Sequence, residues 1–283
     1  MSDSLAERED RPWLAVRVEP SADPQAVVDA LFAAGSLGVQ EDGAAIVTHF
    51  PPGTSASAIE AVVHERDPAA RVTTGPAPAM DWSAWRASVG AHQLGDITIA
   101  PPWLAGESRG GLEVVIDPAM AFGTGEHATT RGVVRLMQRL PRMPDVVADL
   151  GAGSAVLSIC AAKLGAKRIA AIELDPDAIG NAEENVAANS AAESVRVLEG
   201  DAAVLLPLVS PVGLVLANII SSILLELLPL IRDSLVAGGH AILSGILVDE
   251  RPMMVDAIAS EGFEIVAEDT EEGWWSVLIE RAL

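Results

Sequence analysis

The chain has 283 residues, half of them hydrophobic, and a formal net charge of −22. This length and composition allow two domains with sizeable cores, whereas the charge argues against nucleic acid as a ligand, because phosphate contacts need lysine and arginine. A large acidic field favours encounter with a basic partner, although solubility alone would also account for it. We expect no direct nucleic-acid binding and a monomeric chain.

The sequence carries few signals for a special compartment or a covalent cross-link. Cys160 is the single cysteine, so no internal disulfide can form, and a buried structural thiol is predicted. The first ten residues are charged and lack an apolar segment, which predicts no signal peptide and a cytoplasmic location. Polar residues and a proline interrupt the longest apolar stretch, 212–231, so a buried strand and helix fit it better than a membrane span.

The first 76 residues are predicted to form a small α+β domain. Strands are expected over 13–18, 38–40, 44–50 and 70–74, and helices over 23–34 and 55–65. The resulting order β-α-β-β-α-β suggests a ferredoxin-like domain. His49 and His64 stand alone in it, and surface or packing roles are expected for both.

An interdomain linker is predicted over 77–104, and it starts within the segment Gly75-Pro76-Ala77-Pro78. Inside this range a short helix is expected to begin at Asp81 and to place Trp82 and Trp85 on one face. These indoles are expected either to pack between the two domains or to form a docking surface for a partner.

The segment 117–130 is too rich in glycine and threonine for a strand, and a helix is predicted to begin near Thr129. A loop of this kind can close over a bound cofactor. His127 is a candidate base, but it lies among hydroxyl groups and next to Glu126, so a role outside the chemistry is the main alternative.

A second domain is predicted over 105–283, where strands and helices alternate. Strands are expected over 146–148, 168–173, 195–198, 214–217 and 240–245, and helices over 156–164, 176–189, 201–206, 221–235 and 250–261. A hairpin of 263–267 and 274–279 follows. The alternation predicts an α/β fold with a doubly wound parallel sheet.

The turn Asp149-Leu150-Gly151-Ala152-Gly153-Ser154 lies between a predicted strand and a predicted helix, where an open α/β sheet binds a nucleotide-like ligand. Its two glycines let the backbone approach a ligand closely. Glu173 ends the next strand, twenty-two residues beyond Gly151, where a carboxylate can bind the two hydroxyls of a ribose.

The residues around these glycines indicate which nucleotide is bound. A dinucleotide fingerprint has a third glycine where Val156 stands, and no phosphate-binding Gly-Lys-Ser or Gly-Lys-Thr occurs. Asp149 instead gives the Asp-x-Gly-x-Gly pattern of enzymes that use S-adenosylmethionine (AdoMet), in which the acid sits near the methionine end of the cofactor. AdoMet is the predicted cofactor, and a dinucleotide or a purely structural turn are the alternatives.

Two further polar residues are predicted at the carboxyl ends of parallel strands. Asp201 can accept a hydrogen bond from an adenine amine, and Asn218 can orient an amino group beside a sulfonium methyl. An amine nucleophile must be neutral, and desolvation lowers the pKa of lysine from its usual value of about 10.4. This chemistry needs no metal. The alternative for Asn218 is a turn residue that caps the following helix.

Motifs in five places carry a family resemblance. They are Phe122-Gly123-Thr124-Gly125-Glu126-His127-Ala128-Thr129-Thr130, the turn 149–154, Ile172-Glu173-Leu174-Asp175-Pro176, Leu216-Ala217-Asn218-Ile219 and Ser244-Gly245-Ile246-Leu247. Together they resemble the PrmA family, the AdoMet-dependent methyltransferases of the large-subunit ribosomal protein L-eleven. The resemblance spans nearly the whole chain, and the first motif is specific to this family and its close relatives.

The resemblance implies a class I, Rossmann-like AdoMet methyltransferase sheet over 105–283 and a substrate-recognition domain over 1–76. The residues that it implies around AdoMet are Thr130, Gly151, Glu173 and Asn218, with Phe122, Thr124, Asp149, Gly153 and Asp201 close by. Asn218 would also act in catalysis. The implied substrate is the basic ribosomal protein, methylated on lysine ε-amines or on its N-terminal α-amine.

Three departures from the family pattern bear on these expectations. Ala155 stands where the family usually has a third glycine, which costs little if its φ is negative. Glu173 replaces the usual aspartate and would reach a ribose from a longer arm. The residues after Asn218 and the first domain match less closely. A methyltransferase with another substrate protein, and a non-catalytic or dinucleotide-binding protein, are therefore the alternatives.

Overall fold

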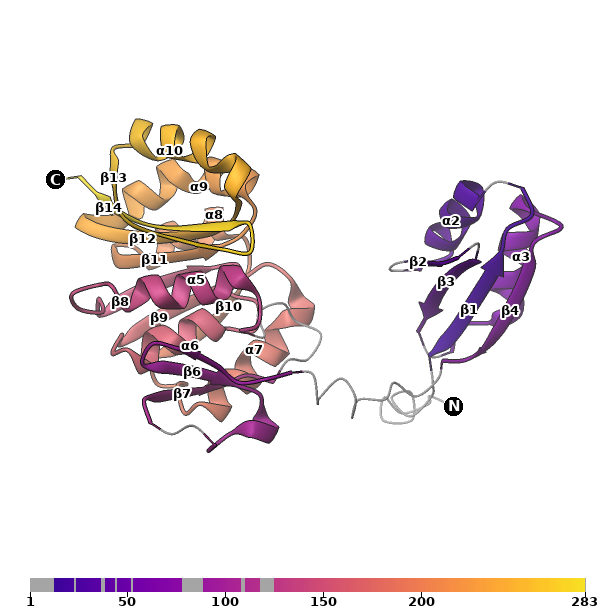
Figure 1. Cartoon of the computed structure of the whole chain (residues 1–283), viewed down its shortest axis with the longest axis horizontal. Helices are drawn as coiled ribbons and strands as arrows, with labels where there is room; N and C mark the ends of the chain where they lie inside the picture. The colour runs from indigo at the N-terminus through magenta and orange to yellow at the C-terminus, as the bar shows by residue number, and fades with distance from the viewer. Residues whose placement is uncertain are drawn as a thin grey trace. The chain divides into compact units, whose positions relative to one another are not determined.

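The computed structural model describes residues 13–22, 24–36, 39–43, 45–51, 53–77, 89–107, 110–117 and 125–282. The chain divides into two compact units, Met1–Arg86 and Ala87–Leu283, each with its own core (Figure 1). Within the described ranges, no helix has the length and apolar character that crossing a membrane requires.

The first unit is a four-stranded antiparallel sheet with two helices. Its elements are β1 (Leu14–Glu19), α2 (Pro24–Ala33), β2 (Val39–Asp42), β3 (Ala45–Phe50), α3 (Ala56–Arg66) and β4 (Arg71–Pro76). The strand order is β2-β3-β1-β4, with every neighbouring pair antiparallel. Val16, Leu31 and Val63 are fully buried in the core of this unit. The element order β-α-β-β-α-β is the one that the sequence predicts.

Strand β4 ends directly before the linker that is predicted over 77–104, and it includes the first two residues of the segment Gly75-Pro76-Ala77-Pro78. Gly75 and Pro76 pair with Ala15 and Leu14 of β1. Proline is accommodated there because β4 is an edge strand. The predicted helix with Trp82 and Trp85 lies outside the described residues.

A small sheet that the sequence analysis did not predict opens the second unit. Strands β5 (His92–Leu94) and β6 (Ile97–Ala100) form a hairpin, and β7 (Leu112–Val115) pairs with β6 in parallel. A short 3₁₀ helix, η1 (Pro102–Leu104), follows β6. The predicted linker range 77–104 therefore contains two strands of the second unit. The missed signal is the pair Gly95-Asp96 between alternating apolar residues.

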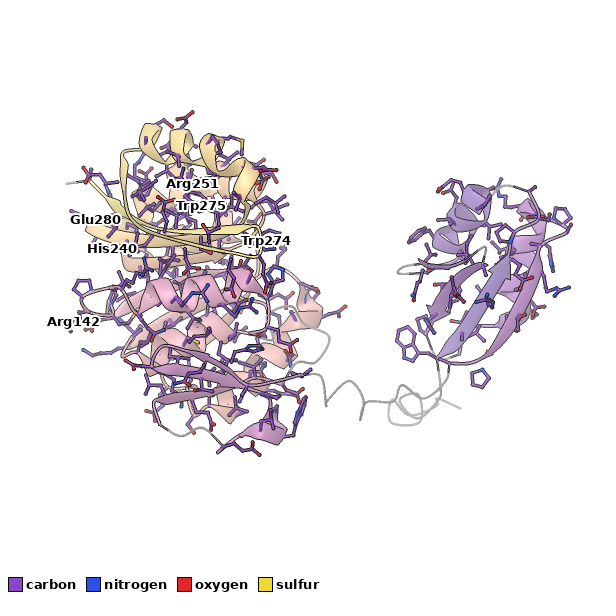
Figure 2. All side chains as sticks on the ribbon, in the orientation of Figure 1. Arg142, His240, Arg251, Trp274, Trp275 and Glu280 are labelled. Atoms are coloured by element: carbon purple, nitrogen blue, oxygen red, sulfur yellow. The ribbon has the colours of Figure 1, made fainter. Side chains whose placement is uncertain are left out.

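The central sheet of the second unit has the strand order β10-β9-β8-β11-β12-β14-β13. Its strands are β8 (Val146–Leu150), β9 (Arg168–Glu173), β10 (Val195–Glu199), β11 (Val212–Asn218), β12 (Leu235–Leu247), β13 (Phe263–Glu271) and β14 (Trp274–Arg281). The first five in this order are parallel, and β14 is antiparallel to both neighbours. His240 faces Glu280, and Leu247 faces Trp274, across the β12–β14 ladder (Figure 2). The predicted doubly wound sheet and final hairpin are confirmed.

Helices cover both faces of the central sheet. On one face lie α5 (Ala128–Met137), α6 (Val156–Lys163) and α7 (Pro176–Ala188), and on the other α8 (Ala202–Val209), α9 (Ser221–Ser234) and α10 (Arg251–Ser260). Successive strand residues feed opposite cores: Val147 packs with the first group of helices and Ala148 with the second. The apolar stretch 212–231 is β11 followed by α9, as the sequence predicts.

The chain reverses the direction in which it builds the sheet between β8 and β11. It proceeds outward from β8 to β9 and β10, and then returns to place β11 on the other side of β8. The carboxyl ends of β8 and β11 therefore meet at a topological switch point, where open α/β sheets bind their ligands. Asp149 lies near the end of β8, and Asn218 ends β11.

Candidate functional site

The glycine turn after β8 is fixed against the neighbouring strand. The N–H groups of Gly151 and Ala152 donate to the carbonyl of Ile172 at 2.9 and 3.0 Å. Gly151 has a φ of +70°, and a Cβ on it would lie 2.6 Å from Cγ2 of Ile219. Glycine is therefore required at this position both by backbone conformation and by space, and the turn meets the loop after β11 at the switch point.

The φ of Ala155 is positive. The expectation that alanine costs little stability at this position, in place of the family's glycine, required a negative φ and is therefore wrong. The φ and ψ of Ala155 are +63° and +17°, in the left-handed region, and it is the residue before α6. This conformation costs an alanine roughly 1–2 kcal/mol of backbone strain. Burial of its methyl group, which is fully inside the core, offsets part of that strain.

Asp149 is fully buried at the end of β8. Its Oδ2 accepts a hydrogen bond of 2.7 Å from Oγ of Ser158 on α6, whereas its Oδ1 is buried and has no hydrogen-bond partner in the described part of the chain. Burial raises the pKa of Asp149 to about 6. Because a buried acceptor without a donor is costly, this oxygen marks a place where a donor from outside the chain would be stabilising.

The carboxylate of Glu173 joins two loops. Its Oε2 accepts from the N–H of Gly153 at 2.7 Å, and its Oε1 accepts from the N–H of Asp175 at 2.8 Å. The longer arm that distinguishes this residue from aspartate is thus used to reach the glycine turn. Each carboxylate oxygen has a second lone pair, so Glu173 retains acceptor capacity for a ribose hydroxyl.

Asp201 follows β10 and caps α8. Its Oδ1 accepts from the N–H of Ala203 at 2.8 Å, and the residue is exposed. The N–H of Gly200 donates to the carbonyl of Glu173 at 2.8 Å, which holds the ends of β10 and β9 together. The structure therefore brings Asp201, Glu173, Gly151 and Asn218 to the ends of four adjacent strands.

Asn218 faces the first turn of α5. Its Nδ2 lies 3.5 Å from Oγ1 of Thr130, whose side chain is fully buried. The following helix, α9, begins after Ile220 and has no side-chain cap. Asn218 therefore does not cap α9, and the alternative that it is only a capping residue is wrong.

His127 is the residue that caps α5. Its Nδ1 accepts from the N–H of Thr129 at 3.4 Å and lies 2.8 Å from Oγ1 of the same residue. Its ring packs edge-on against Trp274, with the ring centroids 5.1 Å apart. These contacts favour a structural role for His127 over a role as a base.

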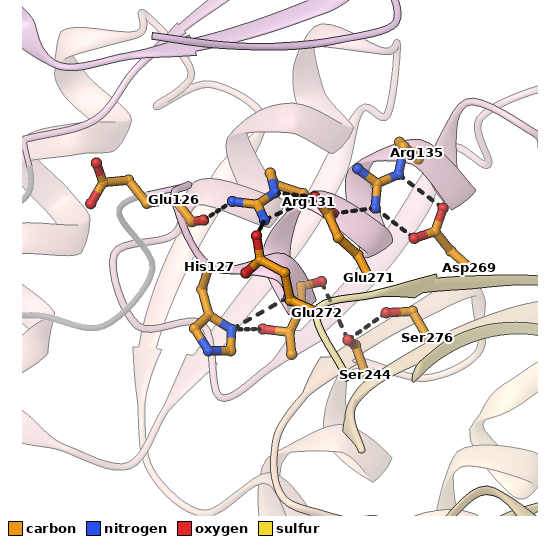
Figure 3. A network of polar contacts seen from close by, with 10 residues as sticks. Glu126, His127, Arg131, Arg135, Ser244, Asp269, Glu271, Glu272 and Ser276 are labelled. Carbon is orange, nitrogen blue, oxygen red and sulfur yellow. Dashed lines mark hydrogen bonds and ion pairs between the residues drawn. The ribbon is translucent and has the colours of Figure 1, made fainter. Parts of the chain in front are cut away.

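A network of arginines and carboxylates holds α5 against the β13–β14 hairpin (Figure 3). Arg131 pairs with Glu271 at 2.9 Å and with Glu272 at 3.0 Å, and Arg135 pairs with Asp269 at 2.5 Å and with Glu271 at 2.6 Å. We call these five residues the arginine clamp. The hydrogen bond from Arg131 holds the pKa of Glu271 below its usual range. The clamp fixes the helix that presents Thr130 to Asn218.

Serine side chains attach the same helix to the sheet. Oγ of Ser244 on β12 donates to the carbonyl of Thr129 at 3.3 Å, and it lies 2.7 Å from Oγ of Ser276 on β14 (Figure 3). A Cβ on Gly132 would lie 2.5 Å from that Ser276 oxygen, so the helix approaches the sheet closely.

Sequence reasoning missed two asparagines, Asn185 on α7 and Asn189 directly after it, which tie this helix to neighbouring segments. Asn185 accepts from the N–H of Asp117 at 2.9 Å and donates to the carbonyl of Ser154 at 3.2 Å. Asn189 bonds the N–H and carbonyl of Val115 at 2.8 and 2.6 Å. Both asparagines are buried. Their spacing of four residues on a predicted helix is the signal that could have found them.

Two of the predicted site residues, Phe122 and Thr124, lie outside the described residues. Cys160 is buried, as predicted, and burial raises the pKa of its thiol. In the described ranges, no group of three or more His, Cys, Asp or Glu side chains is arranged to hold a metal ion.

Comparisons with known proteins match this arrangement to one family. A family model described as ribosomal protein L11 methyltransferase (PrmA) matches residues 15–282. A ribosomal protein L11 methyltransferase of Thermus thermophilus is 39% identical over 199 residues, which cover 70% of this chain and 76% of the relative. One of Clostridium perfringens is 36% identical over 205 residues, 71% of this chain, and the match spans 64% of that relative's length.

A solved structure supports the same relationship. The crystal structure of a ribosomal protein L11 methylase from Lactobacillus delbrueckii subsp. bulgaricus matches with a TM-score of 0.62 and 29% sequence identity. The match covers 69% of this chain and 100% of the other.

Proposed function

Because the chain belongs to the ribosomal protein L11 methyltransferase (PrmA) family, we propose that it transfers methyl groups from AdoMet to amines of ribosomal protein L11. The acceptor amines are lysine ε-amines, the N-terminal α-amine or both. The observation that carries the proposal is the gathering of Gly151, Glu173 and Asn218 at the carboxyl ends of adjacent strands around the switch point.

The residues at the switch point fit AdoMet. The cofactor contains a ribose, whose hydroxyls need acceptors, and an amino-acid end with an ammonium group. Glu173 offers hydrogen-bond acceptors at the end of β9. Oδ1 of Asp149, which is buried and has no hydrogen-bond partner in the described part of the chain, offers negative charge beside the glycine turn. The proposed set is completed by Phe122, Thr124, Thr130, Gly153, Asp201 and Asn218.

The chain's part in the reaction is to bind and orient the acceptor amine. When bound, AdoMet would supply a methyl group on a sulfonium centre, whose carbon a neutral amine can attack while the neutral thioether leaves. Asn218, at the end of β11, is proposed to orient that amine through its amide. Loss of water around the amine lowers its pKa and favours the neutral form. His127 already serves as a helix cap, so we assign it no proton transfer.

The first unit is proposed to be the substrate-recognition domain, with a ferredoxin-like fold inferred from its element order. A basic ribosomal protein suits a chain with a net charge of −22, because opposite charge speeds encounter. Action as a cytoplasmic monomer, without direct nucleic-acid binding, belongs to the same proposal.

The test is transfer of labelled methyl from AdoMet to purified ribosomal protein L11, with mass spectrometry to locate the label. We expect label on lysines or the α-amine, and a rate lower by about 100-fold in Asn218→Ala, because misorientation of a reacting group costs that order of magnitude. The Tm of the variant is measured in parallel to show that it is folded, and AdoMet binding is measured for the wild type. AdoMet binding without label on L11 would contradict the substrate, and absence of AdoMet binding would contradict the cofactor.

A further inference from the structure

Exposed aliphatic side chains lie next to Asn218, in the connection from β11 into the first turn of α9 and at the end of β12. Ile220 and Ile223, which follow β11, are 61% and 45% exposed. Leu247 ends β12, Val248 begins the short 3₁₀ helix η2 (Val248–Glu250), and they are 47% and 37% exposed. We call these four residues the apolar rim. Since they contribute little to the core in these positions, their apolar surface is available to a partner.

Glu250 joins the two halves of the apolar rim. Its Oε1 accepts from Oγ of Ser221 at 2.7 Å, and its Oε2 accepts from the N–H of Leu247 at 2.8 Å. The two loops also meet at Gly245, where a Cβ would lie 2.4 Å from the carbonyl oxygen of Ile219. The apolar rim is therefore one surface built from two adjacent loops.

The surroundings of the apolar rim are acidic. Glu226 lies one turn beyond Ile223, Asp249 directly follows Val248, and both acidic residues are exposed. The sequence contains no lysine or arginine over 219–231 or 240–250. The cations that follow these ranges are both paired: Arg232 with Glu261 at 2.6 Å, and Arg251 with Glu268 at 2.7 Å, where it lies over the ring of Trp275 (Figure 2). The surface thus combines apolar side chains with negative charge that no nearby sequence neighbour offsets.

We propose that the apolar rim is the docking surface for the segment of the substrate protein that flanks the methylated amine, and that this segment is basic and carries aliphatic side chains. The inference rests on the proposed function, since Asn218 marks the reactive end and Ile220 is two residues away. The aliphatic side chains of the segment would cover Ile220 and Leu247, and its cations would meet Glu226 and Asp249. Such a contact also excludes water next to the acceptor amine.

The test uses a pair of exposed positions that tolerate a polar side chain. Ile220→Gln/Leu247→Gln removes apolar surface while keeping side-chain length. Leu208→Gln/Val236→Gln is the matched control, because these residues are 74% and 43% exposed and lie near the amino-terminal ends of β11 and β12. Binding of ribosomal protein L11 to the full chain should weaken by about tenfold in the first variant only. The AdoMet dissociation constant and Tm should match the wild type in both variants.

The outcomes separate this inference from the proposed function. If L11 binding weakens in the rim variant and not in the control, the docking surface is supported. If the wild type also transfers no methyl group to L11, that result contradicts the proposed function alone. L11 binding that is equal in the wild type and the rim variant overturns the inference, and a wild type that binds no L11 overturns both. Conversion of a dimer to a monomer by the rim substitutions, seen by analytical ultracentrifugation, would show a second copy on this surface and would also overturn the inference.

Discussion

Two acidic regions of the second unit differ in how their carboxylates are satisfied. In the arginine clamp, Asp269 and Glu271 meet guanidinium groups at 2.5 to 2.9 Å. At the switch point, Asp149 and Glu173 bind only a serine hydroxyl and backbone N–H groups, and no cationic side chain pairs with either in the described part of the chain. The paired carboxylates hold α5 in place, whereas the two at the switch point are the ones that we propose to face the cofactor.

The pKa directions express the same difference. A hydrogen bond from Arg131 lowers the pKa of Glu271, whereas burial raises that of Asp149 to about 6. The folded chain stabilises the charged form of Glu271 and destabilises the charged form of Asp149. Substitutions in the two regions should therefore act on different quantities: cofactor affinity at the switch point and folding stability in the clamp.

Asp149→Asn is expected to have the largest effect. The amide can keep the contact with Ser158 but removes the charge that we propose to face the ammonium of AdoMet. AdoMet affinity should fall by about 30- to 100-fold, since a hydrogen bond between charged groups contributes roughly 2–3 kcal/mol. Isothermal titration calorimetry measures it, with Asp145→Asn, a surface carboxylate paired with Lys167, as the control. Affinity within threefold of the wild type would show that Asp149 does not contact the cofactor.

The same variant should be more stable than the wild type when no ligand is present. The pKa of Asp149 is about 6 in the folded chain and about 3.9 in the unfolded chain. Above pH 6, where Asp149 is ionised in both states, its buried charge therefore lowers the free energy of unfolding by on the order of 2–3 kcal/mol. As the pH falls from 7.5 to 5, protonation of the folded state restores part of it, and the advantage of the variant should shrink by about 1 kcal/mol. Urea unfolding at both pH values tests this, and an advantage independent of pH would contradict a raised pKa.

Arg135→Met should lower stability and leave AdoMet affinity unchanged. Its partners Asp269 and Glu271 have side chains only 12% and 30% exposed, so loss of the arginine leaves Asp269 without this ion pair, whereas Glu271 keeps its pair with Arg131. We expect a loss of about 1–2 kcal/mol, below the cost of breaking a fully buried pair. Arg142→Met is the control: this arginine is 80% exposed, and loss of its pair with Asp145 should leave stability unchanged because water screens the pair. A large drop in AdoMet affinity in Arg135→Met would place the clamp within the binding site.

Asn185→Ala and Asn189→Ala test the connection between the scaffold and the glycine turn. Asn185→Ala removes two hydrogen bonds to backbone groups and Asn189→Ala removes three, so each should cost roughly 1–3 kcal/mol of stability. Only Asn185 contacts the turn, through the carbonyl of Ser154. AdoMet affinity should therefore fall by about threefold to fivefold in Asn185→Ala alone, a fraction of one such hydrogen bond. Equal affinities in the two variants would show that the turn keeps its geometry without this bond.

The parts of the fold that could be predicted from the sequence are those with local causes. Apolar periodicity and strand-ending turns locate β8 to β14, and a glycine turn followed by an acidic strand end locates Gly151 and Glu173 at one edge of the sheet. Because parallel strands end at the same edge, Asn218 could be added from its place after a predicted strand. These inferences need only the order of elements along the chain.

The missed parts depend on contacts between distant or short segments. Arg131 and Glu271 are 140 residues apart, and nothing in either segment alone indicates their pairing. Ser158 and Asn185 look like ordinary helix residues until the fold brings them to Asp149 and Ser154. The small sheet of β5, β6 and β7 has strands of only three or four residues, so the turn pair Gly95-Asp96 is its main signal in the sequence.

Ala155→Gly is expected to have the smallest effect, and it shows where a backbone angle decides the outcome. Glycine relieves roughly 1–2 kcal/mol of left-handed strain but loses a buried methyl of about 0.8 kcal/mol and adds about 0.5–1 kcal/mol of unfolded-state entropy. The sum lies within about 0.5 kcal/mol of zero. Ala161→Gly is the matched control, since Ala161 is equally buried but lies inside helix α6. There the substitution loses the buried methyl group and adds unfolded-state entropy, and it relieves no backbone strain. It should cost about 2 kcal/mol in urea unfolding. Equal costs at the two positions would show that no strain is stored beside the glycine turn, and a difference near 2 kcal/mol would measure the strain that the switch point carries when no ligand is bound.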